Sequence, residues 1–291
     1  MIHAAKAPVS VLIPTRNEER NLSACLESVA WADEIIVFDS GSTDGTLDVA
    51  AQYDVGLVER AFDNFAAHKN WALDNIGFRN DWILLLDADE RVTEALANEI
   101  RSAVARADDI AGYHIARQTM FGGVWIRHGG VYPDYNLRLL KAGRGRYEDR
   151  LVHEHILLDG PAGYLKNPLL HDDDKGMARF MERHNHYTSL EAVEILRARW
   201  GIGGDRLQGA LWRRGPQRRR WLKNVAQRWL PFRPFFVFLY MYVWKAGLLD
   251  GRAGFHYCFL KMVFEHQISL KVRELGNPGS PLYQRYRAYL E

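Results

Sequence analysis

The N-terminal part of the chain alternates short apolar runs with amphipathic stretches, and this alternation limits the possible folds more than any other feature. The runs are rich in β-branched and aliphatic residues and predict strands at Val9–Pro14, Glu34–Asp39, Gly56–Glu59 and Trp82–Leu86. Between them, apolar residues at three- and four-residue steps predict helices at Glu18–Trp31, Asp44–Tyr53 and Phe65–Ile76. This rhythm predicts an α/β fold with a mostly parallel sheet flanked by helices.

The pattern changes after the fourth predicted strand. We expect a helix over Thr93–Ala107 and then antiparallel strands around Gly112–Phe121 and Asn136–Leu140. From Ala178 onward the spacing is helical again, including Phe255–Glu274, where Phe259, Met262, Val263 and His266 share a face. The sequence therefore predicts a domain over residues 1–175 and a helical C-terminal region over residues 176–291.

Composition is that of an ordinary globular protein, with 47% hydrophobic and 25% charged residues. The two cysteines, Cys25 and Cys258, lie far apart, which predicts neither a disulfide framework nor a zinc cluster and favours a reducing cytoplasm. No signal-peptide pattern opens the sequence. The longest uncharged apolar run, Pro234–Trp244, is shorter than the roughly 20 residues of a spanning helix. We therefore expect a protein that is neither exported nor membrane-spanning.

Polar segments follow three of the predicted strands. They are Pro14-Thr15-Arg16-Asn17-Glu18, Asp39-Ser40-Gly41-Ser42-Thr43-Asp44-Gly45 and Asp87-Ala88-Asp89-Glu90. In an open parallel sheet, ligands bind beyond the carboxyl ends of the strands. The sequence therefore predicts that these segments line one binding edge.

The last of these segments is the most specific. Asp87 and Asp89 leave a buried strand with a single spacer between them, and two carboxylates so placed suit Mg²⁺ or Mn²⁺ bridging a diphosphate. An Asp-x-Asp pair alone is common and often caps a helix. Its position directly after the apolar run favours the metal site.

The segment after Asp39 allows two interpretations that are compatible. The carboxylate could accept from a base N–H while the glycines allow close approach, or the segment could be a turn that caps the next helix. Neither a GxGxxG fingerprint nor a GxxxxGK[ST] loop is present in the sequence. That argues against a dinucleotide dehydrogenase and a P-loop NTPase.

These motifs carry a family resemblance. IPTRNEERNL, VFDSGSTDGT, the HKNWAL stretch at His68–Leu73 and LLLDADE resemble, in order and spacing, the GT-A (Rossmann-like) domain of family 2 glycosyltransferases. GVYPDYNLRLLKAGRGRYEDRLVHEHI and KAGLLDGRAGFHY resemble the branch with bacterial lipopolysaccharide-core β-1,4-glucosyltransferases. The resemblance implies inverting, metal-dependent transfer of a sugar, with glucose favoured, from a UDP-sugar to a lipid-linked saccharide.

The resemblance also implies roles for individual residues of the donor site. Asp39 would bind the uracil beside Ser40, and Lys69 would lie near the base or the phosphates. Asp87 and Asp89, with Ala88 between them, would address the ribose and the metal, with Asp89 the first choice as metal ligand. The residues expected to frame the nucleoside are Pro14, Thr15, Asn17 and Glu18.

Inversion requires a base that takes the proton of the acceptor hydroxyl. Glu154 is the preferred candidate, with Asp134 and Asp149 as alternatives. In a strand, Glu154 would face away from His153 and His155, and the HExxH spacing is absent, which argues against a zinc site.

His171 precedes a run of three aspartates, Asp172–Asp174. It could supply a further ligand to the metal or contact a phosphate. An ordinary loop histidine beside a solvated acidic run is an equally good interpretation.

A basic stretch at Arg213–Lys223 precedes an aromatic-rich segment at Trp229–Trp244. Together they predict peripheral docking on anionic lipid at the inner face of the cytoplasmic membrane, near a lipid-linked acceptor. The aromatic residues suited to this interface are Trp221, Trp229, Tyr240, Tyr242 and Trp244. The alternative is that Phe235–Leu249 is a core helix with solvated basic neighbours.

Further interpretations concern the partners of the chain and its activity. No recognised nucleic-acid motif accompanies the basic stretch, so we expect no nucleic-acid partner. Residues 255–274 could support an oligomer. The chain could also be a catalytically inactive nucleotide-sugar-binding membrane scaffold, or a nucleotidyltransferase, although the usual glycine-rich phosphate loop is not evident near residues 14–20.

Overall fold

The computed structural model describes residues 6–106, 109–148, 155–202 and 232–291. The chain forms two compact units. The first holds Met1–Arg127, Val131–Tyr147 and Glu154–Gly176, and the second holds His128–Gly130, Glu148–His153 and Met177–Glu291. The predicted division of function at residue 175, into a catalytic domain and a membrane-docking region, stays a prediction.

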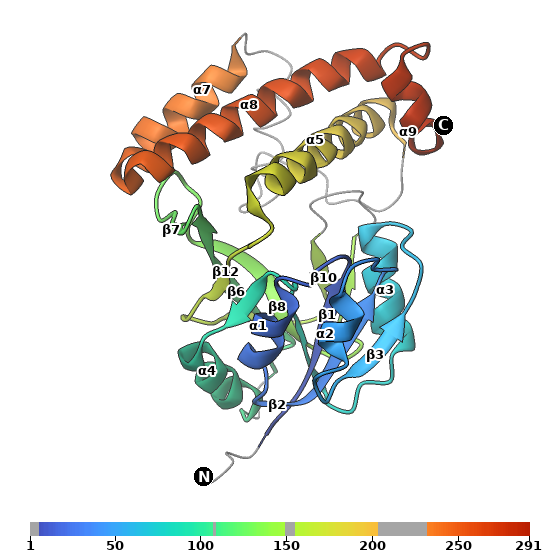
Figure 1. The fold of residues 1–291 in the computed structure, drawn as a ribbon, viewed down its shortest axis with the longest axis vertical. Coiled ribbons are helices and arrows are strands. Elements are labelled where there is room, and N and C mark those ends of the chain that lie inside the picture. Colours follow the sequence, from blue (N-terminus) through green and yellow to red (C-terminus); the bar gives the residue numbers. More distant parts are fainter. Residues whose placement is uncertain (1–5, 107–108, 149–154, 203–231) are drawn as a thin grey trace. The chain divides into compact units, whose positions relative to one another are not determined.

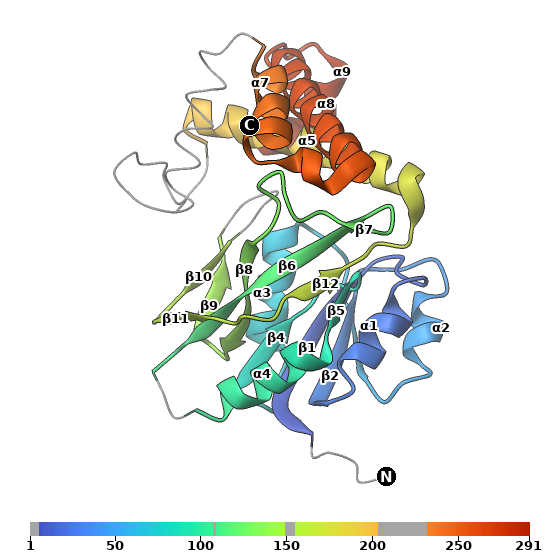
Figure 2. The ribbon, with the colours of Figure 1, turned by 90° about the vertical axis from the view of Figure 1, so that its left-hand side faces the viewer.

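The first unit is built on a ten-stranded mixed sheet (Figure 2). Its main path runs β3-β2-β1-β4-β8-β6-β12-β5, with β7 and β11 paired to β6. The strands are β1 (Ala7–Thr15), β2 (Ala32–Asp39), β3 (Gly56–Glu59), β4 (Trp82–Leu85), β5 (Glu90–Val92), β6 (Gly112–Phe121), β7 (Val124–Trp125), β8 (Asp134–Lys141), β11 (Ala162–Tyr164) and β12 (Leu169–His171). A separate antiparallel pair joins β9 (Gly145–Tyr147) to β10 (Ile156–Leu158).

The pairing within the sheet changes direction along its width. Strands β1 to β4 are mutually parallel, whereas β8 is antiparallel to both β4 and β6. The α/β class, the parallel start and the antiparallel strands after it are confirmed.

Helices cover both faces of the sheet. One core packs α1 (Leu22–Ser28), α2 (Thr46–Ala50) and α4 (Glu94–Val104) against one face, and a second core packs α3 (Phe65–Asn75) against the other. Alternate residues of β1 divide between these cores, with Val11 in the first and Leu12 in the second.

Two helices are shorter than the periodicity predicts. Residues 19–21 form a turn after Asn17, whose backbone is left-handed (φ 56°), so α1 starts only at Leu22, and α2 starts only after the turn at Asp44 and Gly45. The loop residues before each helix therefore remain available to build a site.

The strand ends are in register at one edge of the sheet. Thr15 is paired with Asp39, and Asp39 with Glu59. Leu85 is paired with Leu12, so the Asp87–Glu90 turn leaves β4 beside the end of β1.

The second unit is helical (Figure 1). Its helices are α5 (Gly176–Trp200, whose first residue belongs to the first unit), α7 (Arg233–Leu239), a π-helical turn η1 (Tyr240–Trp244), a 3-10 turn η2 (Gly247–Asp250), α8 (Gly251–Leu275) and α9 (Pro281–Leu290). The alternative interpretation of Phe235–Leu249 as one core helix is therefore wrong, because the backbone is left-handed at Ala246 (φ 56°).

The predicted helix over Phe255–Glu274 lies within α8, but a different face is buried. The shared face of Phe259, Met262, Val263 and His266 is exposed or half-buried. The buried residues are Gly254, Tyr257, Cys258, Phe264, Ile268 and Leu275. In the described parts of the chain, no helix is both long and apolar enough to cross a bilayer. The basic stretch, Trp221 and Trp229 lie outside the described residues.

Candidate donor-binding site

The loops after β1 and β2 are joined by side-chain hydrogen bonds to the backbone. The backbone N–H of Asn17 donates to Ser42 Oγ (2.9 Å), and Asn17 Oδ1 accepts from the N–H of Thr43 (2.8 Å). The N–H of Glu18 donates to Thr46 Oγ1 (2.8 Å). These bonds explain why an asparagine occupies the left-handed position 17, where its short amide can reach neighbouring backbone.

Asp39 organises its own loop. It is fully buried, and its Oδ2 accepts from the backbone N–H groups of Gly41 (2.9 Å) and Ser42 (2.8 Å). Its Oδ1 accepts from Thr15 Oγ1 (2.9 Å) and Ser42 Oγ (2.6 Å). The carboxylate thus uses both oxygens on internal donors, so a base N–H would have to compete with one of these bonds. Pro14, paired with Phe38, precedes Thr15 in the same strand.

Ser40 is positioned by a histidine whose tautomer the surroundings fix. His68 Nδ1 lies 3.0 Å from Arg60 Nη1, which can only donate, so Nδ1 accepts and Nε2–H donates to Ser40 Oγ (2.8 Å). Burial and the charge of Arg60 lower the pKa of His68 to about 4, so the ring is neutral near pH 7. The hydroxyl hydrogen of Ser40 is then left to point at another acceptor. Arg60 is not among the predicted site residues, and His68 is named only as part of the HKNWAL motif, because nothing in their spacing shows this contact.

Lys69 lies beside this cluster on α3. Its Nζ is 4.9 Å from the ring centre of Tyr147, and the neighbouring Asn70 exchanges two hydrogen bonds with the backbone of Tyr147. The charge of Lys69 also contributes to lowering the pKa of Asp87. The charge of Lys69 therefore acts on the acidic turn, while its place near the base or the phosphates stays a prediction.

The Asp87–Glu90 turn carries both a half-buried carboxylate, that of Asp87, and a fully buried one, that of Glu90. Burial opposes ionisation of Asp87, but the charges of Arg138 and Lys69 outweigh it and hold its pKa well below the usual range. Glu90 has no exposed surface, and burial raises its pKa although Arg138 lies beside it. Ala88 is buried in the core, so any contact it makes with a donor would use its backbone.

Asp89 and His171 come together from distant parts of the sequence. Strand β12 pairs with β5 so that His171 is opposite Glu90, and His171 Nε2 lies 3.3 Å from Asp89 Oδ2. Burial lowers the pKa of His171, but Asp89 outweighs burial and the pKa is raised above its usual value. His171 Nδ1 is buried without a hydrogen-bond partner.

The acidic run after His171 is attached to the same edge. Asn21 Nδ2 donates to both Glu18 Oε2 (3.0 Å) and Asp173 Oδ1 (3.1 Å), and Lys175 forms a short ion pair with Glu18. Burial raises the pKa of Glu18 despite the hydrogen bond from Lys175. The sequence analysis missed Lys175, which adds a cation to this edge.

The donor atoms here fit a hard divalent cation. Among the described residues, no three His, Cys, Asp or Glu side chains already surround one metal position. However, Asp89 and His171 place a carboxylate and an imidazole 3.3 Å apart, the imidazole has a buried nitrogen without a hydrogen-bond partner, and Asp87 leaves the same turn as Asp89. Carboxylate oxygens suit Mg²⁺ and Mn²⁺.

Of the three candidate bases, only Asp134 lies among the described residues; Glu154 and Asp149 do not. Asp134 is the first residue of β8 and is paired with Arg117 of β6, whose Nη2 lies 3.3 Å from Asp134 Oδ2. Its side chain is 43% exposed, so a substrate could reach it.

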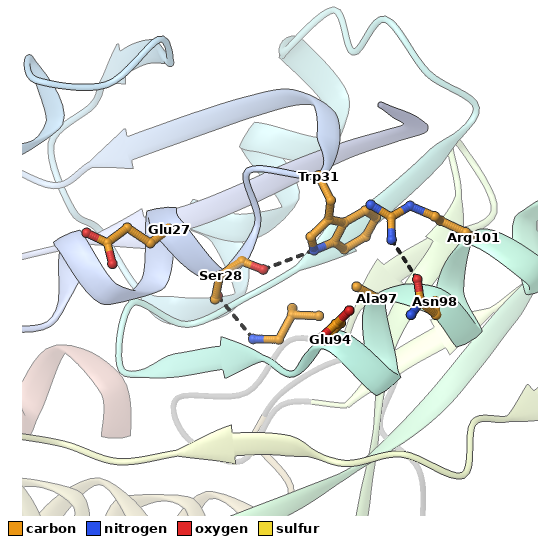
Figure 3. Close-up of a pocket in the computed structure, with 8 residues that line it drawn as sticks. Glu27, Ser28, Trp31, Glu94, Ala97, Asn98 and Arg101 are labelled. Atoms are coloured by element: carbon orange, nitrogen blue, oxygen red, sulfur yellow. Dashed lines mark hydrogen bonds between the residues drawn. The ribbon is translucent and has the colours of Figure 1, made fainter. Parts of the chain in front are cut away.

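A separate groove lies between α1, β5 and α4 (Figure 3). It has a volume of about 480 Å³ and contains none of the predicted site residues. Trp31 Nε1 donates to the backbone oxygen of Ser28 (3.0 Å), and the Arg101 guanidinium lies over the Trp31 ring at 5.4 Å.

Comparisons with known proteins agree with the motifs at the strand ends. Residues 10–169 match the profile of a family described as Glycosyl transferase family 2. The chain is 30% identical to the lipopolysaccharide core biosynthesis glycosyltransferase LpsC of Rhizobium meliloti, over 88% of this chain and 90% of that protein. It is 34% identical to an uncharacterized glycosyltransferase of Rickettsia conorii, over 92% and 93%.

A solved structure is also similar. Glucosyl-3-phosphoglycerate synthase from Mycobacterium tuberculosis, crystallised with Mn²⁺, UDP and glucosyl-3-phosphoglycerate, matches 68% of this chain and 82% of that chain, with 18% identity and a TM-score of 0.45. The profile match and the two relatives establish the family: the chain belongs to glycosyl transferase family 2.

Proposed function

We propose that the protein transfers a sugar, with glucose favoured, from a UDP-sugar to a lipid-linked saccharide during lipopolysaccharide core assembly. The observation that carries the proposal is the contact of His171 with Asp89, two residues after Asp87, at the edge where Asp39 orders the neighbouring loop. The family membership and the relative named LpsC support the reaction and its setting.

The edge divides into a nucleoside part and a diphosphate part. Ser40, with its hydroxyl hydrogen available, and the Asp39-ordered loop would contact the uracil, while Pro14, Thr15, Asn17 and Glu18 frame the nucleoside. Asp87, Asp89 and His171 would hold a Mg²⁺ or Mn²⁺ ion. The ion would neutralise charge developing on the leaving diphosphate.

The acceptor hydroxyl needs a base on the side away from the diphosphate. Glu154 remains our proposed base, with Asp134 and Asp149 as alternatives. Asp134 also pairs with the cation Arg117, whose Nη2 lies 3.3 Å from Asp134 Oδ2.

We test the proposal with purified protein, UDP-glucose and other nucleotide sugars, Mn²⁺ and lipopolysaccharide core acceptors. We expect transfer with inverted anomeric configuration and a loss of at least about 100-fold in kcat/KM for Asp89→Ala, since the metal supplies charge stabilisation in the transition state. Asp159→Ala is the matched control, because Asp159 pairs on the surface with Arg144.

Three outcomes would contradict the proposal. Unchanged turnover in Asp89→Ala would remove the metal assignment. UDP binding without turnover on any donor or acceptor would indicate the inactive scaffold. Release of pyrophosphate would indicate a nucleotidyltransferase.

We also propose that the second unit docks on an anionic membrane surface at the inner face of the cytoplasmic membrane. An apolar stripe at helical spacing normally faces a core, but on α7 and η1 it is exposed. Its exposed members are Phe232, Phe235, Phe236, Leu239, Tyr240, Val243 and Trp244.

The opposite side of the same turns packs on α8. Phe238 stacks on Tyr242, and Phe255 of α8 contacts both rings edge-on. Tyr242 is half-buried and its ring packs against these two phenylalanines, so its place in the membrane interface stays a prediction. Trp244, with 80% of its surface exposed, remains in it.

Flotation with phosphatidylglycerol vesicles tests this surface. We expect the wild-type protein to float, and Phe236→Glu with Val243→Glu to abolish flotation, since two carboxylates oppose burial among anionic headgroups. Leu57→Glu, at an exposed apolar residue of the first unit, is the control. Equal flotation of the double variant, or wild-type protein that stays in solution, would contradict the docking surface.

A further inference from the structure

Two buried residues, Glu90 at the end of the acidic turn and Arg138 of β8, have no role in the reaction described so far. Arg138 Nη2 lies 2.6 Å from Asp87 Oδ2 and 2.6 Å from Glu90 Oε1, so one nitrogen joins both carboxylates. Glu90 Oε2 accepts from the backbone N–H of Asp87 (3.0 Å), and the N–H of Glu90 donates to the oxygen of Asp87 (2.8 Å). Glu90 thus holds the backbone of the turn, and Arg138 holds its side chains.

We propose that Glu90 and Arg138 are positioning residues that fix the direction in which Asp87 presents its carboxylate to the donor. This rests on the proposed function, in which Asp87 binds the nucleotide sugar and its metal.

The arrangement leaves one oxygen of Asp87 available. Arg138 takes Oδ2, whereas none of the hydrogen bonds among the described residues uses Oδ1. The Asp87 side chain is 37% exposed, while those of Arg138 and Glu90 are 11% and 0% exposed. Asp87 can therefore present Oδ1 to a ligand in a fixed direction, whereas Glu90 and Arg138 are too buried to contact the ligand.

Stability alone is a poor explanation for this cluster. Burying charged groups carries a large desolvation cost, and well-packed apolar residues often stabilise a core as well or better. Hydrogen-bonding partners behind a ligand carboxylate typically change metal affinity or activity by about 10- to 100-fold when removed. The cluster has the geometry for that second role.

A double-mutant cycle separates positioning from direct contact. We measure the affinity for UDP in the presence of Mn²⁺ by calorimetry for wild type, Arg138→Met, Asp87→Ala and the double variant. We expect Arg138→Met to weaken UDP binding by about 10- to 100-fold and to have no further effect in the Asp87→Ala background, because its effect passes through Asp87. Arg138→Lys, which keeps a charged donor, should fall between.

Two further variants guard against a trivial result. Arg144→Met removes a surface cation that pairs with Asp159 and should leave UDP affinity unchanged. If Arg138→Met does not fold, Glu90→Gln keeps the volume of the side chain but removes one of its two acceptor oxygens. Its weaker UDP binding should also depend on Asp87.

Two outcomes would overturn this proposal alone: a lower melting temperature of Arg138→Met with unchanged UDP affinity, or additive losses in the double variant. The first would make Arg138 purely structural, and the second would place it against the donor itself. Wild-type protein that binds no UDP, or Asp87→Ala that binds it normally, would overturn the proposed function as well.

Discussion

At the scale of single residues, the donor-site loops are held by side chains that bond their own backbone before any ligand arrives. Asp39 is the clearest case, since its two oxygens hold the backbone and hydroxyl groups of residues 41 and 42 and the hydroxyl of Thr15. A preordered loop lowers the conformational cost of binding a nucleotide. The hydroxyl of Ser40 is then presented by a fixed backbone.

His68 gives a pH dependence that can be measured without any ligand. Its pKa is about 4 in the folded protein and near its usual 6.5 when unfolded, so the unfolded chain binds the extra proton between these values. The contribution of neutral His68 to the free energy of unfolding is complete above pH 6.5 and is lost as the pH falls toward 4. The free energy of unfolding should rise through this range by up to about 1.4 kcal/mol per pH unit.

Denaturant unfolding of wild type and His68→Gln at pH 4.5 and pH 6.5 checks this pH dependence. We expect the variant to lose this part of the slope, because glutamine does not titrate. Parallel pH profiles for the two proteins would show that His68 is not the group responsible.

The site was only partly predictable at this scale. The acidic turn, Asn17 and Asp39 follow apolar runs and could be recognised from the sequence. Arg138 and Lys175 could not, because each meets a carboxylate from a distant part of the chain. Arg60 could not, because it reaches the edge only through the pairing of β3 with β2. A single arginine in a strand carries no signal of the carboxylate it will meet.

At the scale of elements, the turn η2 depends on a glycine at position 254. A Cβ there would lie 2.1 Å from the backbone oxygen of Gly247 and 2.8 Å from Asp250 Cβ. The close approach joins the first turn of α8 to η2 and explains Gly254, one of the three glycines within KAGLLDGRAG.

Gly254→Ala should therefore destabilise the protein, by about 1–3 kcal/mol, the usual range for overpacking. Thermal unfolding followed by circular dichroism measures it. Gly77→Ala is the control, since an added Cβ at Gly77 meets no atom within 4 Å. Equal melting temperatures for wild type and Gly254→Ala would mean that the turn relaxes without cost.

The sequence predicted strands better than helices. The parallel strands are apolar runs that end sharply at polar loops, so their bounds follow from composition. Helix bounds depend on the backbone geometry of neighbouring turns, such as the left-handed residues Asn17 and Ala246, which apolar spacing does not show. The exposed stripe on α7 also shows that spacing identifies an apolar face but not its partner.

At the scale of the whole molecule, family membership and the mixed sheet confirm the GT-A class that the motifs predict. A ligand that binds only the folded chain must stabilise it, by about 2.7 kcal/mol at one hundred times its Kd.

UDP with Mn²⁺ should therefore raise the melting temperature, and UDP with EDTA should raise it less, because the diphosphate then lacks the cation at Asp89. Differential scanning fluorimetry with each addition checks this. Mn²⁺ alone is the control, and an equal shift for UDP with and without EDTA would argue against a metal-assisted donor site.

The chain passes between its two units more than once. His128–Gly130 belong to the helical unit, where His128 bonds Asp250 through its backbone N–H (2.8 Å) and its ring (2.7 Å), and Gly129 donates to the oxygen of Lys245 (2.8 Å). The flanking residues Arg127 and Val131 belong to the sheet unit. A chimera that exchanges the C-terminal helices between relatives must therefore also exchange residues 128–130, or the new helices will lack the loop that bonds to residues 245 and 250.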